Sequence, residues 1–308
     1  MSKRTKELLD AKINKKDEFY TLIETIEEEL FEYKKFFENK TVYCNCDDLN
    51  KSNFFKFFIN NFDTFKLNKI IATSFNKNGN GLYGEFNKDK KLIIKNLVGN
   101  GSFDSEECLS FLNEADIVVT NPPFSLLRKF MDLLIKNKKD FIVLGNILIV
   151  TYDTVLKQII ENKLFIGHSI HGGSIKFLVP NDYQVYSYRF KIEDNKKYIF
   201  VKGIRWFTTF NHNKFQNLEL HYELDFNLHK KLDNYDIINV DKTKYIPKNY
   251  DGLICVPVTF IDKYNPSQFK ILGELYQMDL SNYLTGTSTK KTVNGKKPFQ
   301  RLVIRCIK

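Results

Sequence analysis

The sequence has few of the features that mark secreted or membrane-spanning proteins. It contains only five cysteines among 308 residues, and an odd number argues against a framework of disulfide bonds. No apolar run approaches the roughly 20 residues that a helix needs to cross a bilayer. The first residues also lack the apolar core of a signal peptide. We therefore expect a cytoplasmic protein that does not enter the membrane.

Residues that could bind a metal ion are also sparse. Cys44 and Cys46 alternate faces of a predicted strand, and the local sequence offers no further ligand. His168 and His171 lie in a glycine-rich loop without a carboxylate close by. We expect inert cysteines and solvent-exposed histidines, and therefore no bound metal.

What the chain does contain is an excess of positive charge and of aromatic residues. Its net charge is +10 and its pI is near 9.1, which favours a polyanionic partner, either nucleic acid or an anionic membrane surface. The 28 Phe and 16 Tyr residues predict a heavily aromatic core. The hydrophobic share of 43% and the charged share of 27% are those of an ordinary globular protein.

Predicted strands and helices alternate along the first half of the chain, which indicates an α/β fold. The strands share short runs of buried residues and are expected at 41–46, 69–74, 117–119 and 141–146, with a hairpin at 82–95. Two more strands, at 164–167 and 174–179, are expected to finish the sheet. The helices are expected at 22–37, 52–62, 126–137 and 154–161, with one more that begins after Ser105. Ser125 is the expected cap of the 126–137 helix, and Glu29 belongs to a solvated acidic face of the first helix.

The pattern changes after Pro180, where strands alternate with short polar links. We expect one domain at residues 1–180 and a second region at 181–308. The chain from 285 to its end carries basic residues and no acidic residue. Its basic loops suit contacts with phosphates, although a solvated tail could look similar. The candidate DNA-binding residues are Lys290, Lys291, Lys296, Lys297 and Arg301.

The most informative segment is Asn121, Pro122, Pro123 and Phe124, which follows a buried β-branched run. Because proline fixes its own φ and biases the residue before it, neither Asn121 nor Pro122 should begin a helix. The side-chain oxygen of Asn121 and the carbonyl of Pro122 are two acceptors that match the two donors of an amino group. Phe124 offers a face on which a planar base or amide can stack. The alternative is a strand-to-loop turn with an incidental aromatic residue.

Asn-Pro-Pro-Phe resembles the catalytic signature of methyltransferases that use S-adenosylmethionine to methylate amino groups. Longer segments extend the likeness, and the chain is similar to the EcoRI-type adenine-specific DNA methyltransferases. These segments are residues 16–21, 42–48, 52–56, 116–126, 250–252, 256–260, 263–266 and 268–269. The resemblance implies a Rossmann-like methyltransferase sheet followed by a mixed target-recognition region, with the cofactor site before the catalytic motif in the chain.

The resemblance also implies positions for the cofactor, S-adenosyl-L-methionine. Phe19 and Tyr20 would lie beside it, and so would Asn121. Residues 43–48 stand where most such enzymes have a glycine-rich loop, and they contain no glycine. Which residues of this segment touch the cofactor stays open; the candidates are Tyr43, Asn45, Cys46, Asp47 and Asp48. Asp104 is a candidate for the adenine ring of the cofactor.

The sequence is therefore interpreted as an enzyme that methylates the exocyclic amino group of a flipped adenine in double-stranded DNA. No cysteine follows a proline, so the nucleophile of enzymes that methylate cytosine at carbon is absent. Phe177 could close the pocket or belong to the core. RNA methylation is the main alternative, and a catalytically silent DNA-binding protein is another. The resemblance suggests a monomer, a restriction endonuclease that acts on the same site, and GAATTC as a first target sequence.

Overall fold

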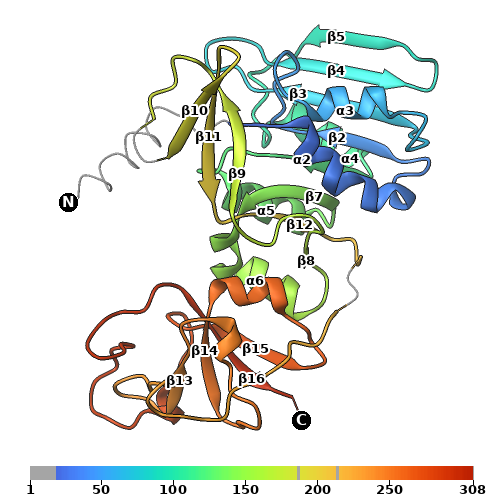
Figure 1. The fold of residues 1–308 in the computed structure, drawn as a ribbon. Coiled ribbons are helices and arrows are strands. Elements are labelled where there is room, and N and C mark those ends of the chain that lie inside the picture. The colour runs from blue at the N-terminus through green and yellow to red at the C-terminus, as the bar shows by residue number, and fades with distance from the viewer. Residues whose placement is uncertain (1–18, 186–187, 213–214, 308) are drawn as a thin grey trace. The chain divides into compact units, whose positions relative to one another are not determined.

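The computed structural model describes residues 19–185, 188–212 and 215–307 (Figure 1). The described chain divides into two compact units. The first unit contains residues 19–146 and 164–212, and the second contains residues 147–163 and 215–307. Within the described residues, no helix is long and apolar enough to cross a membrane.

An eight-stranded mixed sheet forms the centre of the first unit, with the order β5-β4-β3-β2-β6-β7-β12-β8. Its four central strands are parallel and are β3 (Lys69–Ser74), β2 (Thr41–Cys44), β6 (Ile117–Thr120) and β7 (Asp140–Asn146). All residues of β2 and β6 are buried, as is typical of strands covered on both faces. The predicted α/β fold with these strands is confirmed.

The flanking strands all form antiparallel pairs. They are β4 (Leu82–Asn87), β5 (Leu92–Asn96), β12 (Ile204–Thr208) and β8 (Phe165–Ile166). The predicted hairpin is β4 and β5, which pair antiparallel at the edge beyond β3. Strand β12 runs antiparallel between β7 and β8. The sheet is therefore mixed, with a parallel centre.

The order of the central strands creates a topological switch. Strand β2 pairs with β3 on one side and with β6 on the other. The chain passes from β2 to β3 on one side and later places β6 on the other side of β2. The order of the strands therefore reverses between β2 and β6, and the carboxyl ends of these two strands lie next to each other. Open α/β sheets bind their ligands in the crevice at such a point.

The helices of the first unit are α2 (Ile23–Leu30), α3 (Phe54–Asn60), α4 (Glu106–Glu114) and α5 (Leu127–Lys136). The predicted first helix tightens after Leu30 into the 3₁₀ helix η1 (Phe31–Phe36). Side chains on α2, α3 and η1 build the predicted aromatic core; for example, the rings of Phe57 and Phe58 are 5.2 Å apart. Ser105 caps α4, since its hydroxyl accepts from Cys108 N at 3.3 Å.

The predicted cap at Ser125 is wrong, because a turn precedes α5. Leu126 N donates to Pro123 O at 2.9 Å, and Leu126 then occupies the N-cap position. The helix therefore begins at Leu127, after this turn has carried the chain away from the two prolines.

The prediction that Glu29 is solvated is also wrong, because this carboxylate is fully buried. It accepts hydrogen bonds from His168 N at 2.8 Å and from Ser169 N at 2.7 Å. The hydroxyl of Tyr33 donates to it at 2.9 Å. A side chain at position 167 would collide with Glu29, so Gly167 is required there. Glu29 thus fastens the loop between β8 and the next strand onto α2.

A second sheet of the first unit has the order β1-β9-β11-β10 (Figure 1). Its strands are antiparallel and are β1 (Tyr20–Thr21), β9 (Ser174–Val179), β11 (Lys196–Lys202) and β10 (Arg189–Glu193). The expectation that residues 174–179 finish the main sheet is therefore wrong. Strand β9 pairs with β1 and β11 instead, and the last places of the main sheet belong to β12 and β8.

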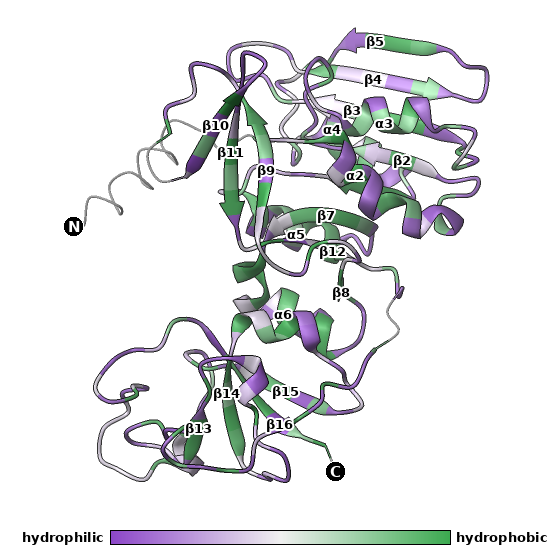
Figure 2. Cartoon of the chain, in the orientation of Figure 1, coloured by the Kyte–Doolittle hydropathy of each residue, from purple (hydrophilic) through white to green (hydrophobic). Residues whose placement is uncertain are grey.

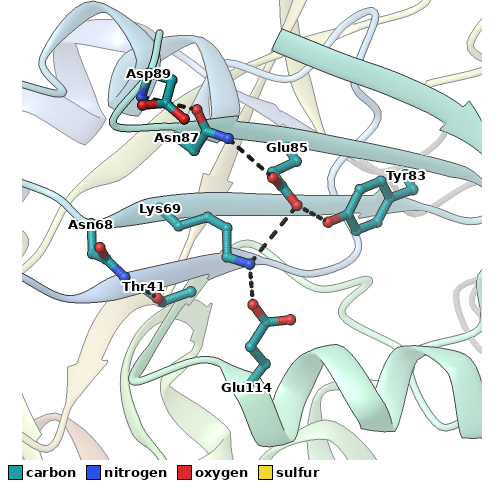
Figure 3. A network of polar contacts seen from close by, with 8 residues as sticks. All are labelled: Thr41, Asn68, Lys69, Tyr83, Glu85, Asn87, Asp89 and Glu114. Carbon is teal, nitrogen blue, oxygen red and sulfur yellow. Dashed lines mark hydrogen bonds and ion pairs between the residues drawn. The ribbon is translucent and has the colours of Figure 1, made fainter. Parts of the chain in front are cut away.

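Polar contacts fix β4 and α4 against β3 (Figure 3). Lys69 Nζ lies 3.9 Å from Glu85 and forms a closer ion pair with Glu114. The hydroxyl of Tyr83 donates to Glu85. Burial, together with Glu85, raises the pKa of Tyr83 above its usual range, so its proton stays in place.

The second unit is built on a four-stranded sheet of order β13-β14-β16-β15. The strands are β13 (Ile237–Asn239), β14 (Leu253–Pro257), β16 (Arg301–Cys306) and β15 (Phe269–Glu274). Figure 2 shows hydrophobic residues along β14 and mainly hydrophilic residues in the loops around it. An earlier part of the chain joins this unit and contains η2 (Ile147–Thr151) and α6 (Asp153–Ile160). Gln277 donates to Thr151 O at 2.6 Å and so ties the two parts together.

Candidate active site

The Asn-Pro-Pro-Phe segment lies directly after β6, at the carboxyl edge of the parallel strands. Pro122 is buried, while Asn121, Pro123 and Phe124 are half-buried. As predicted, neither Asn121 nor Pro122 is part of a helix. The segment therefore occupies the edge where β2 and β6 form the switch point.

The Asn121 side chain is held by the strand that precedes the first helix. Its Nδ2 donates to Phe19 O at 2.7 Å and to Thr21 Oγ1 at 3.2 Å. These two acceptors fix the orientation of the amide, so Oδ1 points the other way. Oδ1 is buried and has no donor among the described residues. A buried acceptor left unpaired costs about 1–3 kcal/mol, and a ligand that donates to it recovers this free energy.

Phe124 belongs to a cluster of aromatic rings. Its ring meets those of Phe19 and Phe177 edge to face, with centroid distances of 5.4 Å and 6.1 Å. Phe19 also packs edge-on against Tyr183 and Tyr188 at 5.8 Å and 5.7 Å. Phe177 is fully buried, so it is a core residue that also supports the Phe124 ring.

A narrow pocket lies in front of this motif and brings several of the predicted residues together. It is lined by Asn121 and Pro123 from the motif and by Cys46 and Asp47 from the loop after β2. Its other lining residues are Phe19, Tyr20 and Thr21 from the segment before the first helix, Asp48 and Ser52 from the loop after β2, and Phe54 at the start of α3. The predicted cofactor segment and the predicted catalytic segment thus share one pocket.

Asn45, at the carboxyl end of β2, contains a second unpaired atom. Its Oδ1 accepts from Cys46 N at 2.7 Å, and its carbonyl accepts from the hydroxyl of Thr120 at the end of β6. Its Nδ2 is buried and has no acceptor in the described part of the chain. Two neighbouring strands therefore end in one unpaired donor and one unpaired acceptor.

Cys46 explains how the loop turns without a glycine. Its φ is +59°, in the left-handed region that favours glycine and costs other residues roughly 1–2 kcal/mol. The turn brings Asp47 N within 3.0 Å of Thr73 O on β3. The sequence carries no sign of this conformation, because a cysteine at the end of a strand is normally extended.

Asp47 is buried, and both of its carboxylate oxygens accept hydrogen bonds. One accepts from the Ser52 hydroxyl, and the other accepts from Phe55 N at 3.1 Å. Burial raises the pKa of this carboxyl group to about 7, despite these two donors. Asp47 therefore fixes the start of α3 to the loop and shapes the pocket wall.

Two other predicted residues, like Asn45, do not line the pocket. Tyr43 is fully buried, and its hydroxyl lies 2.7 Å from Thr73 Oγ1. Asp104 lies in the loop before α4 and accepts from Lys129 and from Ser102, which lowers the pKa of its carboxyl group. Neither side chain reaches the pocket lining, and a role for either in cofactor binding stays a prediction.

The predicted basic residues lie in the second unit and differ in exposure. Lys290, Lys296 and Lys297 are exposed. Lys291 donates to Leu275 O and Met278 O, both at 2.7 Å.

Arg301 is only 9% exposed and donates to Asn239 Oδ1 at 3.0 Å and to Phe299 O at 2.8 Å. Both Lys291 and Arg301 thus hold local structure. Three of the five predicted residues, Lys290, Lys291 and Lys297, line a pocket of about 740 Å³ with Tyr235 and Tyr276.

Sequence reasoning missed Thr21 and Ser52. Thr21 orients the Asn121 amide across about a hundred residues of chain, and Ser52 holds Asp47. Both are small hydroxyl residues with no distinctive spacing.

The residues that were considered as metal ligands differ in exposure: Cys44 is buried, whereas His168 and His171 are exposed. Within the described ranges no cluster of three or more His, Cys, Asp or Glu residues could hold a metal ion.

An Asn-Pro-Pro-Phe segment with an unpaired amide oxygen, at the switch point of an α/β sheet, defines the class of methyltransferases that act on amino groups. Comparison with known proteins narrows this class. The family model described as adenine-specific methyltransferase EcoRI matches residues 7–306. No solved structure matches the chain at a significant level.

Three relatives cover nearly the whole chain. It is 40% identical to the type II methyltransferase M.EcoRI of Escherichia coli, over 96% of this chain and 94% of that protein. It is 39% identical to the type II methyltransferase M.MgeORF184P of Mycoplasma genitalium, over 96% and 97% of the two chains. It is 37% identical to the type II methyltransferase M.MpnI of Mycoplasma pneumoniae, over 96% of both. The chain therefore belongs to the EcoRI-type family of adenine-specific methyltransferases, and it is a site-specific DNA methyltransferase.

Proposed function

We propose that S-adenosyl-L-methionine is the methyl donor and that the pocket between β2 and β6 holds it. The eight-stranded sheet would then be a Rossmann-like cofactor-binding sheet. The residues present fit this cofactor: Asn45, at the end of β2, offers an unpaired buried donor, and Asp48, in the loop after β2, lines the pocket. Phe19, Tyr20 and Cys46 supply the rest of the nearby wall. When bound, the cofactor supplies an electrophilic methyl group.

The target in this proposal is the amino group of an adenine flipped out of duplex DNA. Flipping costs a few kcal/mol, which contacts in the pocket must offset. Asn121 Oδ1 and the carbonyl of Pro122 accept the two amino hydrogens, and Phe124 packs against the base. The residues act mainly by positioning, since a well-oriented bound geometry lowers the barrier without a covalent nucleophile.

The observation that carries the proposal is the unpaired Oδ1 of Asn121. Nδ2 of the same amide is already held by Phe19 O and Thr21 Oγ1. The amide is therefore oriented before any ligand arrives, as electrostatic preorganisation requires.

A methyl-transfer assay with tritiated S-adenosylmethionine tests the proposal. We expect label in duplex DNA and not in RNA or added protein. Label that appears only in RNA would show that the substrate is RNA. Absence of both label and cofactor binding would indicate a silent DNA-binding protein.

We also propose that residues 1–180 carry cofactor binding and catalysis, and that residues 181–308 carry target recognition. The residues proposed to contact DNA there are Lys290, Lys291, Lys296, Lys297 and Arg301.

The protein is proposed to be a cytoplasmic monomer with a cognate restriction endonuclease. GAATTC is the first site to test. Methylation-sensitive sequencing of DNA from cells that express the protein identifies the site directly.

A further inference from the structure

The outer face of the β1-β9-β11-β10 sheet carries an ordered set of basic and aromatic side chains. Residues paired across antiparallel strands point to the same face. The pairing Tyr20 with Leu178, Leu178 with Tyr198, and Tyr198 with Lys191 therefore makes one row across all four strands. All four side chains are at least partly exposed.

The neighbouring rows of this face add further positive charge. Lys176, Phe200 and Arg189 form the next row, and Lys202 lies one row beyond them. Arg189 packs over the Phe200 ring at 5.3 Å, and Lys176 packs over the Tyr198 ring at 4.1 Å. Such packing orders the cations while leaving their charge available to an anion.

Two carboxylates oppose this charge. Glu193 lies on the same face, where it forms ion pairs with Lys176 and, at 2.6 Å, with Lys191. Glu24 of α2 also acts electrostatically on Lys176. Arg189 and Lys202 form no ion pair within the described residues, so the face remains positive after these pairs are made.

The face continues to the mouth of the candidate active site. Tyr20 begins the four-residue row and also lines the pocket with Asn121. Lys51 lies 5.8 Å from the centroid of the Tyr20 ring, where its charge is opposed by Asp48 at 3.6 Å. Three strand spacings separate Tyr20 from Lys191, which is about 14 Å. One strand of a DNA duplex carries about four phosphates over that length.

We propose that this face, defined by Tyr20, Lys176, Lys191, Arg189, Tyr198 and Lys202, binds the phosphate backbone of the DNA duplex beside the flipped adenine. The inference rests on the proposed function, because it assumes that the pocket receives the base. A base that enters beyond Tyr20 leaves its flanking phosphates over the sheet. The basic side chains then position the duplex without reading its sequence.

Salt dependence of duplex binding tests the proposal. The double variant Arg189→Gln/Lys202→Gln removes two charges that have no partner carboxylate among the described residues. Each cation that no longer neutralises a phosphate reduces the slope of log K against log salt concentration by about 0.9 in magnitude. We therefore expect weaker binding and a slope smaller by about 1.8 in fluorescence anisotropy.

Two further variants make the test specific. Glu193→Gln removes the opposing charge, so it is expected to tighten binding and steepen the salt dependence. Lys66→Gln/Lys90→Gln is the control: it also removes two exposed charges from the first unit, and these pair with Glu38 and Asp63 near the amino end of β3 in the eight-stranded sheet. Binding by this control is expected to match the wild type.

The possible outcomes separate this inference from the proposed function. If the wild type methylates duplex DNA but Arg189→Gln/Lys202→Gln binds DNA with the wild-type slope, the DNA-binding face is refuted and the proposed function stands. If the wild type transfers no methyl group to DNA, the proposed function fails and the face loses its premise. If the double variant loses binding to anionic phospholipid vesicles but not to DNA, the face is a membrane site instead.

Discussion

At the scale of single residues, the account depends on two amides at the ends of adjacent strands. Asn121 lines the pocket and presents an unpaired acceptor, and Asn45 presents an unpaired donor that is buried at the end of β2. The loop that carries Asn45 turns through Cys46, whose backbone adopts a conformation suited to glycine. Local strain of this kind clusters at functional sites, where the surrounding structure must enforce it.

Replacement of Cys46 tests this strain. Cys46→Gly relieves roughly 1–2 kcal/mol of backbone strain and loses about 0.4–1 kcal/mol through the larger entropy of the unfolded chain. We expect a net stabilisation of up to about 1.5 kcal/mol in urea unfolding. Cys46→Val should destabilise the protein, because a β-branched residue tolerates positive φ poorly. Equal stability of the Gly and Val variants would contradict the strained turn.

Asp47 gives a prediction about pH. Burial raises the pKa of its folded-state carboxyl to about 7, above its ordinary value of 3.8. The native state therefore binds more protons than the unfolded state between these values, and stability falls as pH rises through this range. Relative to Asp47→Asn, the wild type should lose stability between about pH 4 and pH 7. A difference between the two proteins that does not vary with pH would show that the Asp47 carboxyl titrates normally.

At the scale of elements, the second sheet matters because it orients the site. Strand β1 pairs with β9, and this pairing sets the Phe19 carbonyl and the Thr21 hydroxyl against Asn121. The loop before β9 is fastened to α2 by Glu29. A short edge strand of two residues thus acquires a fixed place from contacts at both ends of β9.

Substitution of Glu29 tests the importance of this loop. Glu29→Gln replaces one acceptor oxygen with an amino group that faces backbone donors, so the buried hydrogen bonds to that oxygen cannot form. We expect destabilisation by about 2 kcal/mol or more in urea unfolding. Glu28→Gln on the exposed side of the same helix is the control and should change stability little. If both variants are equally stable, the Glu29 contacts do not fasten the loop.

At the scale of the whole molecule, sequence patterns predicted the parallel strands well because each is a short buried run. The non-helical conformation of Asn121 and Pro122 was also predictable, since two prolines after such a run allow few conformations. The partners of Asn121 were not, because β1 is brought to the motif by tertiary pairing alone. Glu29 was misjudged for a similar reason: helical periodicity marks glutamate as polar and cannot show which carboxylate binds a distant loop.

The division of the chain follows contacts that the sequence does not display. Strand β12 lies beyond residue 180, but it belongs to the eight-stranded sheet, where it pairs antiparallel with both β7 and β8. Residues 147–163 belong to the compact unit that contains the C-terminal sheet. A functional boundary at residue 180 remains a prediction, to be tested by separating DNA binding from methyl transfer in variants on either side of it.

The measurement that tests the central claim most directly is mass spectrometry of nucleosides from DNA incubated with the enzyme and S-adenosylmethionine. The wild type should produce adenine methylated on its amino group. Asn121→Ala should lower the rate by about 10²–10³-fold while cofactor and DNA binding persist. Asn137→Ala, which removes a half-buried amide that donates to Leu133 O at 2.8 Å in α5, should leave the rate unchanged. Normal methylation by Asn121→Ala would contradict the assignment of this site.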